Sequence, residues 1–148
     1  MEKESTKYWI LQAIVSLLIL LWVYAALSKL TDIDQFTREI KQQHLPLLTA
    51  QTAVWLLPTI ELIAATLLIF PKWRRTGLLL SSILMFTFTI YIILVLSGYF
   101  KNIPCSCGGV LKQLGWRNHL IFNIFFLVLG IMGIHLSKRK EDAVTVIK

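Results

Sequence analysis

The chain has 148 residues, of which 56% are hydrophobic, and its mean hydropathy is +0.68. This exceeds what one soluble core of that size needs, and it indicates a single integral membrane domain over residues 1–148. The formal net charge of +7 does not indicate nucleic-acid binding, because the fifteen Lys and Arg residues are spread over loops and tails. They form no basic groove interleaved with aromatic residues, so we interpret them as determinants of membrane orientation.

Four stretches are long and apolar enough to cross a hydrocarbon layer of about 30 Å: residues 8–30, 47–70, 76–99 and 119–136. Lipid cannot hydrogen-bond to the backbone, so each stretch is expected to be a helix. The first exceeds the roughly 7–15 apolar residues of a signal-peptide core, and we expect it to be retained. The fold class predicted is an all-α bundle of four transmembrane helices.

The distribution of positive charge predicts the orientation. Four spans place both termini and the second connection on one face, which carries nine of the fifteen Lys and Arg residues. These charges concentrate in the short segments 72–75 and 138–140, where the positive-inside rule is strongest. We therefore expect cytoplasmic termini. In a bacterium, the protein would lie in the inner membrane, with the first and third connections facing the periplasm.

The first outer connection is predicted to contain a short amphipathic helix. Its apolar residues recur at helical spacing: Ile33, Phe36 and Ile40. Thr31 suits the N-cap, Asp32 and Asp34 suit the first turn, and Pro46 ends the pattern. We expect this helix to lie flat on the outer surface near the third connection. It is either a lid or docking platform, or a solvated connector.

Both cysteines lie in the third connection, residues 100–118, within Pro104-Cys105-Ser106-Cys107-Gly108-Gly109. A Cys-x-Cys pair can form a disulfide only if its backbone curls away from full extension, and Gly108 and Gly109 permit such a curl. A bridge in so small a ring is expected to be readily reduced. This suits a disulfide that is exchanged with other proteins.

Positive charge around the pair favours the reactive thiolate. Lys101, Lys112, Arg117 and His119 are close in sequence, and the N-terminus of the fourth span adds its dipole. Two alternatives remain open. The cysteines are a structural disulfide, or they bind a metal with His119 or His44. The metal pattern is weak, and we expect no metal.

Glu61 falls about midway along the second span, where an ionised carboxylate must be paired or protonated. Pro58, three residues earlier, removes a backbone donor and predicts a kink that exposes a carbonyl near the carboxylate. Two interpretations stay open for Glu61. It transfers protons, or it is protonated and hydrogen-bonded to a neighbouring helix.

Polar residues also collect in the outer half of the fourth span, after Trp116 and Arg117. His119 and Asn123 are four residues apart and share a helix face. With two residues of the third span, they are predicted to form a pocket beneath the cysteine loop, large enough for a quinone ring or a substrate thiol. The expected lining is Thr87, Tyr91, His119 and Asn123. The alternative is that Asn and His only join helices.

Three motifs together resemble the DoxX superfamily of small four-span bacterial membrane proteins, and within it the MauE-like branch. Lys29-Leu30 with Asp32 and Phe36 resembles a K-L-x-D-x-x-x-F signature, and Pro58 with Glu61 resembles P-x-x-E. The third motif resembles the cysteine loop and polar opening of the last span in that branch: Cys105-Ser106-Cys107-Gly108-Gly109, Leu114-Gly115-Trp116 and Asn123.

This resemblance implies a role in periplasmic disulfide chemistry beside a thioredoxin-like partner. MauE itself is associated with maturation of the disulfide-rich small subunit of methylamine dehydrogenase. The chain departs from the branch at Phe122, where an arginine is expected before Asn123. A quinone or anion contact made by that arginine would therefore be missing here.

Two cysteines on one face cannot carry electrons across about 30 Å of bilayer by thiol exchange alone, so a second carrier is required. The hypothesis is that Cys105 and Cys107 exchange disulfides with a periplasmic thioredoxin-fold protein. A membrane quinone near Tyr91, His119 and Asn123 would then give or receive the electrons. The alternatives are a non-catalytic subunit or assembly factor with a structural disulfide, and a small transporter or metal-handling protein that uses Glu61.

Overall fold

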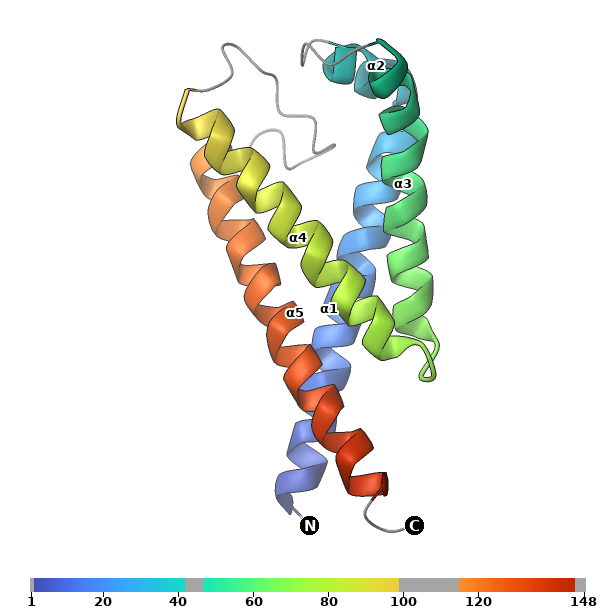
Figure 1. Cartoon of the computed structure of the whole chain (residues 1–148), viewed down its shortest axis with the longest axis vertical. Coiled ribbons are helices and arrows are strands. Elements are labelled where there is room, and N and C mark those ends of the chain that lie inside the picture. Colours follow the sequence, from blue (N-terminus) through green and yellow to red (C-terminus); the bar gives the residue numbers. More distant parts are fainter. Residues whose placement is uncertain (1, 42–46, 99–114, 146–148) are drawn as a thin grey trace.

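The computed structural model describes residues 2–41, 47–98 and 115–145. Every regular element in these residues is a helix (Figure 1). The helices are α1 (Glu2–Thr31), α2 (Ile33–Lys41), α3 (Leu47–Ile69), α4 (Arg74–Leu96) and α5 (Gly115–Thr145). All but α2 are long and apolar enough to cross a membrane, which confirms the four predicted spans. The chain is therefore a multi-pass, all-α membrane protein.

The ends of the spans differ from the predicted ones where polar residues continue or interrupt a helix. α5 begins at Gly115 and continues to Thr145, well beyond the apolar stretch at both ends, because backbone hydrogen bonding does not stop where hydropathy falls. α4 ends at Leu96, and Gly98 adopts a left-handed φ of +77°. A glycine in that conformation is a common way to end a helix.

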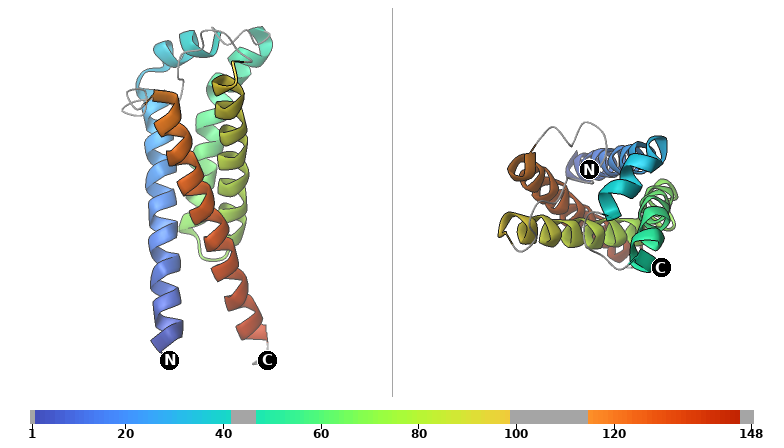
Figure 2. Two further views of the ribbon diagram at one scale, coloured as in Figure 1. Left: turned by 90° about the vertical axis from the view of Figure 1, so that its left-hand side faces the viewer. Right: turned by 90° about the horizontal axis from the view of Figure 1, so that it is seen from above.

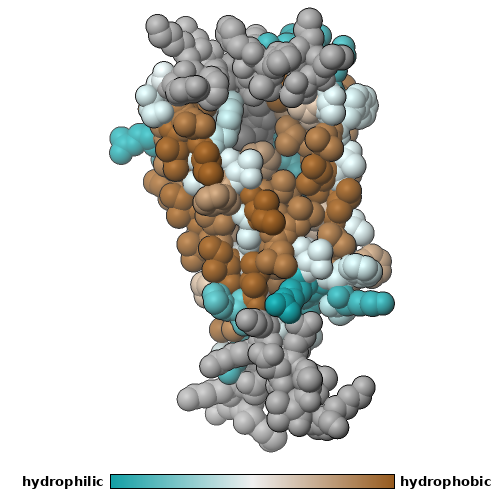
Figure 3. All heavy atoms as spheres, in the orientation of Figure 1, coloured by the Kyte–Doolittle hydropathy of each residue, from teal (hydrophilic) through white to brown (hydrophobic). Residues whose placement is uncertain are grey.

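The outer surface of the bundle is apolar along the middle of its length (Figure 3). Within the apolar windows of the four spans, only between 22% and 39% of the residues are buried inside the protein. Large apolar side chains such as Leu20 and Ile121 are about two-thirds exposed, at 68% and 66%. Apolar surface on this scale must be covered, and the lipid bilayer covers it.

The helices form two closely packed pairs, α1 with α3 and α4 with α5 (Figure 2). The core between them contains Leu18, Trp22, Leu68 and Leu78, whose side chains are almost fully buried. The indole Nε1 of Trp22 donates a hydrogen bond of 2.9 Å to Ser81 Oγ, which joins α1 to α4. The indole N–H, the one polar group of the Trp22 side chain, therefore has a hydrogen-bond partner in the apolar interior.

Gly77 allows α4 to approach the end of α3 at close range. A Cβ atom at this position would lie 2.8 Å from the backbone nitrogen of Leu68 and 3.0 Å from the carbonyl carbon of Leu67. Backbone atoms cannot move aside as a side chain can. Any larger residue at position 77 would therefore separate the two helices.

α2 forms the predicted short amphipathic helix, and it lies across the end of the bundle (Figures 1 and 2). Phe36 and Ile40 are buried, and they pack against Val54 of α3. The exposed residues Asp34, Arg38 and Lys41 face away from the bundle. The hydrophobic pattern was therefore sufficient to identify this element.

The predicted N-cap of α2 was wrong by one residue. Asp32 caps the helix, since its Oδ1 accepts a hydrogen bond of 3.1 Å from the backbone N–H of Gln35. Thr31 is still part of α1, where its hydroxyl donates to the carbonyl oxygen of Leu27 at 3.0 Å. The reason is that α1 continues one residue further than expected, so the break between the two helices falls at Asp32.

Candidate functional site: a polar cavity inside the bundle

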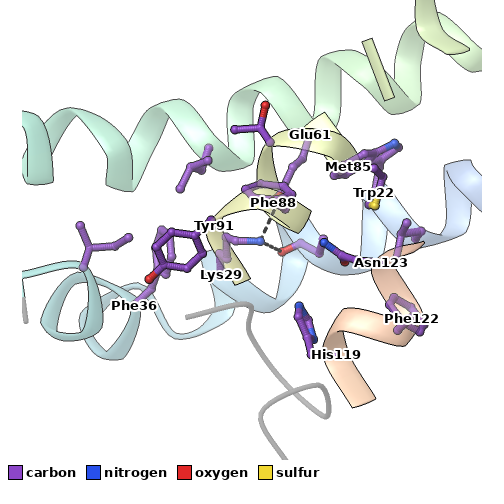
Figure 4. A pocket seen from close by; sticks show the side chains of 15 residues that line it. Trp22, Lys29, Phe36, Glu61, Met85, Phe88, Tyr91, His119, Phe122 and Asn123 are labelled. Carbon is purple, nitrogen blue, oxygen red and sulfur yellow. Dashed lines mark hydrogen bonds and ion pairs between the residues drawn. The ribbon is translucent and has the colours of Figure 1, made fainter. Parts of the chain in front are cut away.

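A cavity of about 230 Å³ lies between the helices, beneath α2 (Figure 4). All five helices contribute to its walls, and most of the lining side chains are apolar or aromatic, including Trp22, Phe36, Phe88 and Phe122. Its polar lining residues are Lys29, Glu61, Thr87, Tyr91, His119 and Asn123. A mostly apolar cavity with a few convergent polar groups is the usual form of a small-molecule site.

An ion pair joins α1 to α3 at the wall of this cavity. Lys29 Nζ lies 2.8 Å from Glu61 Oε1, and the two side chains are only 6% and 2% exposed. The same ammonium group donates to the carbonyl oxygen of Ala25 at 3.1 Å, and it lies 5.9 Å from the centre of the Phe36 ring. Removal of either partner would leave an uncompensated buried charge, which typically costs about 3–5 kcal/mol.

That Lys29 is the partner of Glu61 could not be predicted from the sequence motifs. Lys29 was singled out only through the family signature. Lys29 lies near the end of α1, whereas Glu61 lies near the middle of α3. They meet because Lys29 is close to the end of α1, whereas α3 begins well before Glu61: fourteen residues, or about 21 Å of helix, separate Glu61 from the start of α3 at Leu47. The sequence did contain one indication of this pair. Two adjacent apolar spans carry opposite charges, and a charge inside a membrane span requires a partner.

His119 and Asn123 face the cavity from the first three turns of α5, as their spacing predicted. They are 3% and 4% exposed. His119 Nδ1 and Asn123 Nδ2 are buried and have no hydrogen-bond partner within the described residues. The His119 ring stacks on Phe122, with ring centres 6.4 Å apart and an angle of 25° between planes. These nitrogens do not serve as hydrogen-bonded joints between the described helices.

Tyr91 and Thr87 of α4 also line the cavity, so the structure brings the four predicted pocket residues together. Figure 4 shows Lys29 at the centre of the view, with Asn123 and His119 of α5 beside and below it. Three lining residues were not among those predicted: Trp22 and the two α2 residues, Phe36 and Ile40. Their apolar side chains looked like ordinary core, and only the tertiary arrangement makes them cavity walls.

Three buried polar atoms at this site lack a hydrogen-bond partner in the described part of the chain: Glu61 Oε2, His119 Nδ1 and Asn123 Nδ2. An unsatisfied buried group costs about 1–3 kcal/mol, so a molecule that pairs with these atoms recovers that free energy. The cavity is also larger than the roughly 150 Å³ that suffices for benzene in an apolar protein cavity. The site therefore suits a planar ring with polar atoms at its edge.

The other predicted residues that the structure describes do not line the cavity. Trp116 and Arg117 are in the first turn of α5 and do not line it. Pro58 is buried within α3, and the helix runs through it from Leu47 to Ile69; the predicted kink stays a prediction. Asp32 caps α2, as described above.

The cysteine loop and His44 lie outside the described residues, so Cys105, Cys107, Gly108 and Gly109 have no described geometry. Chain connectivity still constrains the loop. Residues 99–114 connect Gly98, just after α4, to Gly115, and His119 follows one helical turn later. Among the described residues, no three His, Cys, Asp or Glu side chains converge as metal ligands would.

Comparison with known proteins identifies the family. The family model for methylamine utilisation protein MauE matches residues 7–136, which cover α2, the cysteine loop and all but the outermost residues of the four spans. Searches of curated proteins and of solved structures found no match. Because the family match extends over most of the chain, this multi-pass membrane protein belongs to the MauE family.

Proposed function

We propose that this protein is a thiol–disulfide redox protein of the bacterial inner membrane. Cys105 and Cys107 exchange disulfides with a periplasmic thioredoxin-fold protein, and a membrane quinone bound in the cavity exchanges electrons with the cysteine pair. The observation that supports this most directly is the cavity with unpartnered buried polar atoms. It lies in the half of the bundle where the cysteine-bearing connection joins α4 to α5.

The electrons balance in two steps. In the oxidising direction, the dithiol of the partner reduces the Cys105–Cys107 disulfide through a mixed disulfide, and the partner leaves with its own disulfide formed. The two resulting thiols then lose two electrons and two protons and form their disulfide again. A quinone accepts both electrons and both protons and becomes a quinol. The reverse sequence would deliver electrons to the partner.

The cavity has the features that such a ring requires. Phe122, where an arginine is expected in this branch, supplies an aromatic wall; it lies 4.7 Å from the Phe126 ring between centres. His119 Nδ1, when protonated, and Asn123 Nδ2 can each donate a hydrogen bond to a quinone oxygen. The positive charge of the missing arginine is not replaced at this position, but Lys29 supplies a positive charge elsewhere in the wall.

Trapping of mixed disulfides tests the exchange step. A Cys105→Ser or Cys107→Ser variant leaves one nucleophile that cannot resolve its adduct, so one of the two should accumulate a covalent complex with a periplasmic protein. The complexes are detected on non-reducing gels and identified by mass spectrometry, with the double Cys→Ser variant as control. If neither single variant forms an adduct, the proposal fails.

Substitution of Asn123 tests the quinone site. Asn123→Leu preserves the approximate size of the side chain and removes the amide donor, which should weaken binding of a short-chain ubiquinone about tenfold, the value of one typical hydrogen bond. Binding is measured by titration of the full-length protein in detergent. Asn118→Leu, at an exposed position five residues earlier in α5, is the matched control. Equal affinity in all three proteins would exclude this role for Asn123.

The exposed polar face of α2 favours one alternative, a non-catalytic subunit or assembly factor that docks through this helix. Asp34, Arg38 and Lys41 form that face. In this case, the cysteines are a structural disulfide. A double Cys→Ser variant would then retain partner binding and support the activity of the assembled complex, whereas Arg38→Glu would lose partner binding.

A further inference from the structure

The two carboxylate oxygens of Glu61 have different environments. Oε1 is held by Lys29 Nζ at 2.8 Å, whereas Oε2 is buried and has no hydrogen-bond partner within the described residues. Glu61 as a whole is 1% exposed and lines the cavity. A carboxylate that is anchored through one oxygen and has no partner at the other can accept and release a proton without moving away from Lys29.

We infer that Glu61 is the proton-exchanging group of the cavity, with Oε2 as the atom that carries the proton to and from a bound quinone. Lys29 is a positioning residue, which holds the carboxylate and stabilises its charged form. This inference rests on the proposed function, because quinone chemistry is what demands the proton. The inference gives the Lys29–Glu61 ion pair a function in proton transfer, because binding of a quinone does not by itself require an ion pair.

The proton has few other routes within the cavity. The titratable and charged side chains that line it are Lys29 from α1, Glu61 from α3, Tyr91 from α4 and His119 from α5. The two lining residues from α2, Phe36 and Ile40, carry no titratable group. His119 Nδ1 lacks a partner in the described residues and is the nearest chemical alternative as a proton donor.

The protons balance without exchange with the cytoplasm. Formation of the Cys105–Cys107 disulfide releases two protons, and reduction of a quinone to a quinol consumes two. Glu61 takes up one of the released protons at Oε2 and passes it to a quinone oxygen, which regenerates the carboxylate paired with Lys29. The second proton follows the same route or reaches the other oxygen from His119.

The test measures binding and rate separately in the full-length protein. The cysteine pair is first reduced with a small dithiol, the dithiol is removed, and a short-chain ubiquinone is added. Quinone reduction is followed by its ultraviolet absorbance, and quinone affinity by titration under non-reducing conditions. Glu61→Gln keeps an acceptor for Lys29 but cannot carry the proton. We expect its reduction rate to fall roughly 10²-fold, the usual contribution of a general acid, while its affinity changes less than about threefold.

Three further variants separate proton exchange from structural effects. Glu39→Gln alters another buried carboxyl, on α2 and outside the cavity lining, and should leave the rate unchanged. Lys29→Arg keeps the positive charge, although a guanidinium cannot release a proton, and should lower the rate less than Glu61→Gln does. If Glu61→Gln does not fold, the double variant Lys29→Met/Glu61→Gln leaves no unpaired charge buried and should show the same loss of rate.

The outcomes distinguish this inference from the proposed function. If the wild-type protein reduces no quinone, the proposed function fails, and the inference fails with it. If Glu61→Gln reduces quinone at the wild-type rate, Glu61 is not the proton carrier, although the proposed function stands. A parallel loss of quinone affinity would make Glu61 a binding group only, and a Lys29→Arg rate as low as that of Glu61→Gln would assign the proton to the ammonium. Each of these results overturns the inference.

Discussion

Lys29 and Glu61 show how a single pair of residues can determine the interior of a membrane bundle. Each is a charged side chain within an apolar span, and neither is tolerable alone at that depth. Their contact at 2.8 Å joins α1 to α3, and it leaves Glu61 Oε2 buried without a hydrogen-bond partner in the described residues. One interaction therefore contributes to both the packing of the helices and the chemistry of the site.

The ion pair should make the two positions strongly interdependent in stability. Lys29→Met leaves a buried carboxylate without a partner and should lower the free energy of unfolding by about 3–5 kcal/mol. The double variant Lys29→Met/Glu61→Leu replaces both charges by apolar groups and should recover most of that loss. Unfolding in mixed detergent micelles measures both variants. Additive effects of the two substitutions would contradict a direct interaction.

At the scale of the element, α2 is a short helix whose position depends on its cap and on its apolar face. Nine residues are too few for a helix that is stable by itself, so α2 requires both the Asp32 cap and the packing of Phe36 and Ile40 on α3. Because these two apolar residues also line the cavity, the stability of α2 determines how well the cavity is covered.

Loss of the cap should loosen α2 specifically. Asp32→Ala removes the acceptor for the Gln35 N–H and should cost about 0.5–2 kcal/mol. Hydrogen exchange of the amides in residues 33–41 should accelerate accordingly, while exchange in α3 stays slow. Thr31→Ala is the matched control, since the Thr31 hydroxyl bonds within α1. Equal acceleration in both variants would argue against Asp32 as the cap.

The contact of α4 with α3 predicts an unequal response of two glycines to alanine. At Gly77, the added Cβ would meet the backbone of α3 at 2.8 Å, and we expect a destabilisation of about 1–3 kcal/mol. At Gly133, the nearest atom, also at 2.8 Å, is the end of the Leu78 side chain, which can change rotamer. Gly133→Ala should therefore cost clearly less. Thermal unfolding in detergent compares the stabilities of the two variants. If Gly133→Ala is the less stable one, the backbone contact between α3 and α4 can adjust to a Cβ atom at position 77.

At the scale of the whole molecule, the two ends of the bundle are built differently. α1 begins and α5 ends at one end of the bundle, whereas α2, the end of α4 and the start of α5 lie at the other (Figure 1). The cavity opens beneath α2, on the side of the cysteine-bearing connection. A redox relay from a soluble partner to a lipid-soluble carrier needs such an arrangement, with the entry point and the internal site on the same side.

The orientation in the membrane can be tested through the cysteines themselves. If the positive-inside rule holds for this chain, Cys105 and Cys107 face the periplasm. A membrane-impermeant thiol reagent should then label them in intact spheroplasts after mild reduction, without lysis. Labelling only after the membrane is permeabilised would reverse the predicted topology. The double Cys→Ser variant gives the background, because the chain has no other cysteine.

The four spans, the amphipathic α2 and the shared face of His119 and Asn123 could all be predicted from the sequence. These features depend on hydropathy and helical periodicity, which are local properties of the chain. It also carried enough family motifs to indicate the MauE-like branch, which the family match confirmed. The pairing of Lys29 with Glu61, and the cavity lined by Trp22, Phe36 and Ile40, depend on how the helices pack. The depth at which two helices meet depends on their offsets and tilts, and no local pattern encodes these.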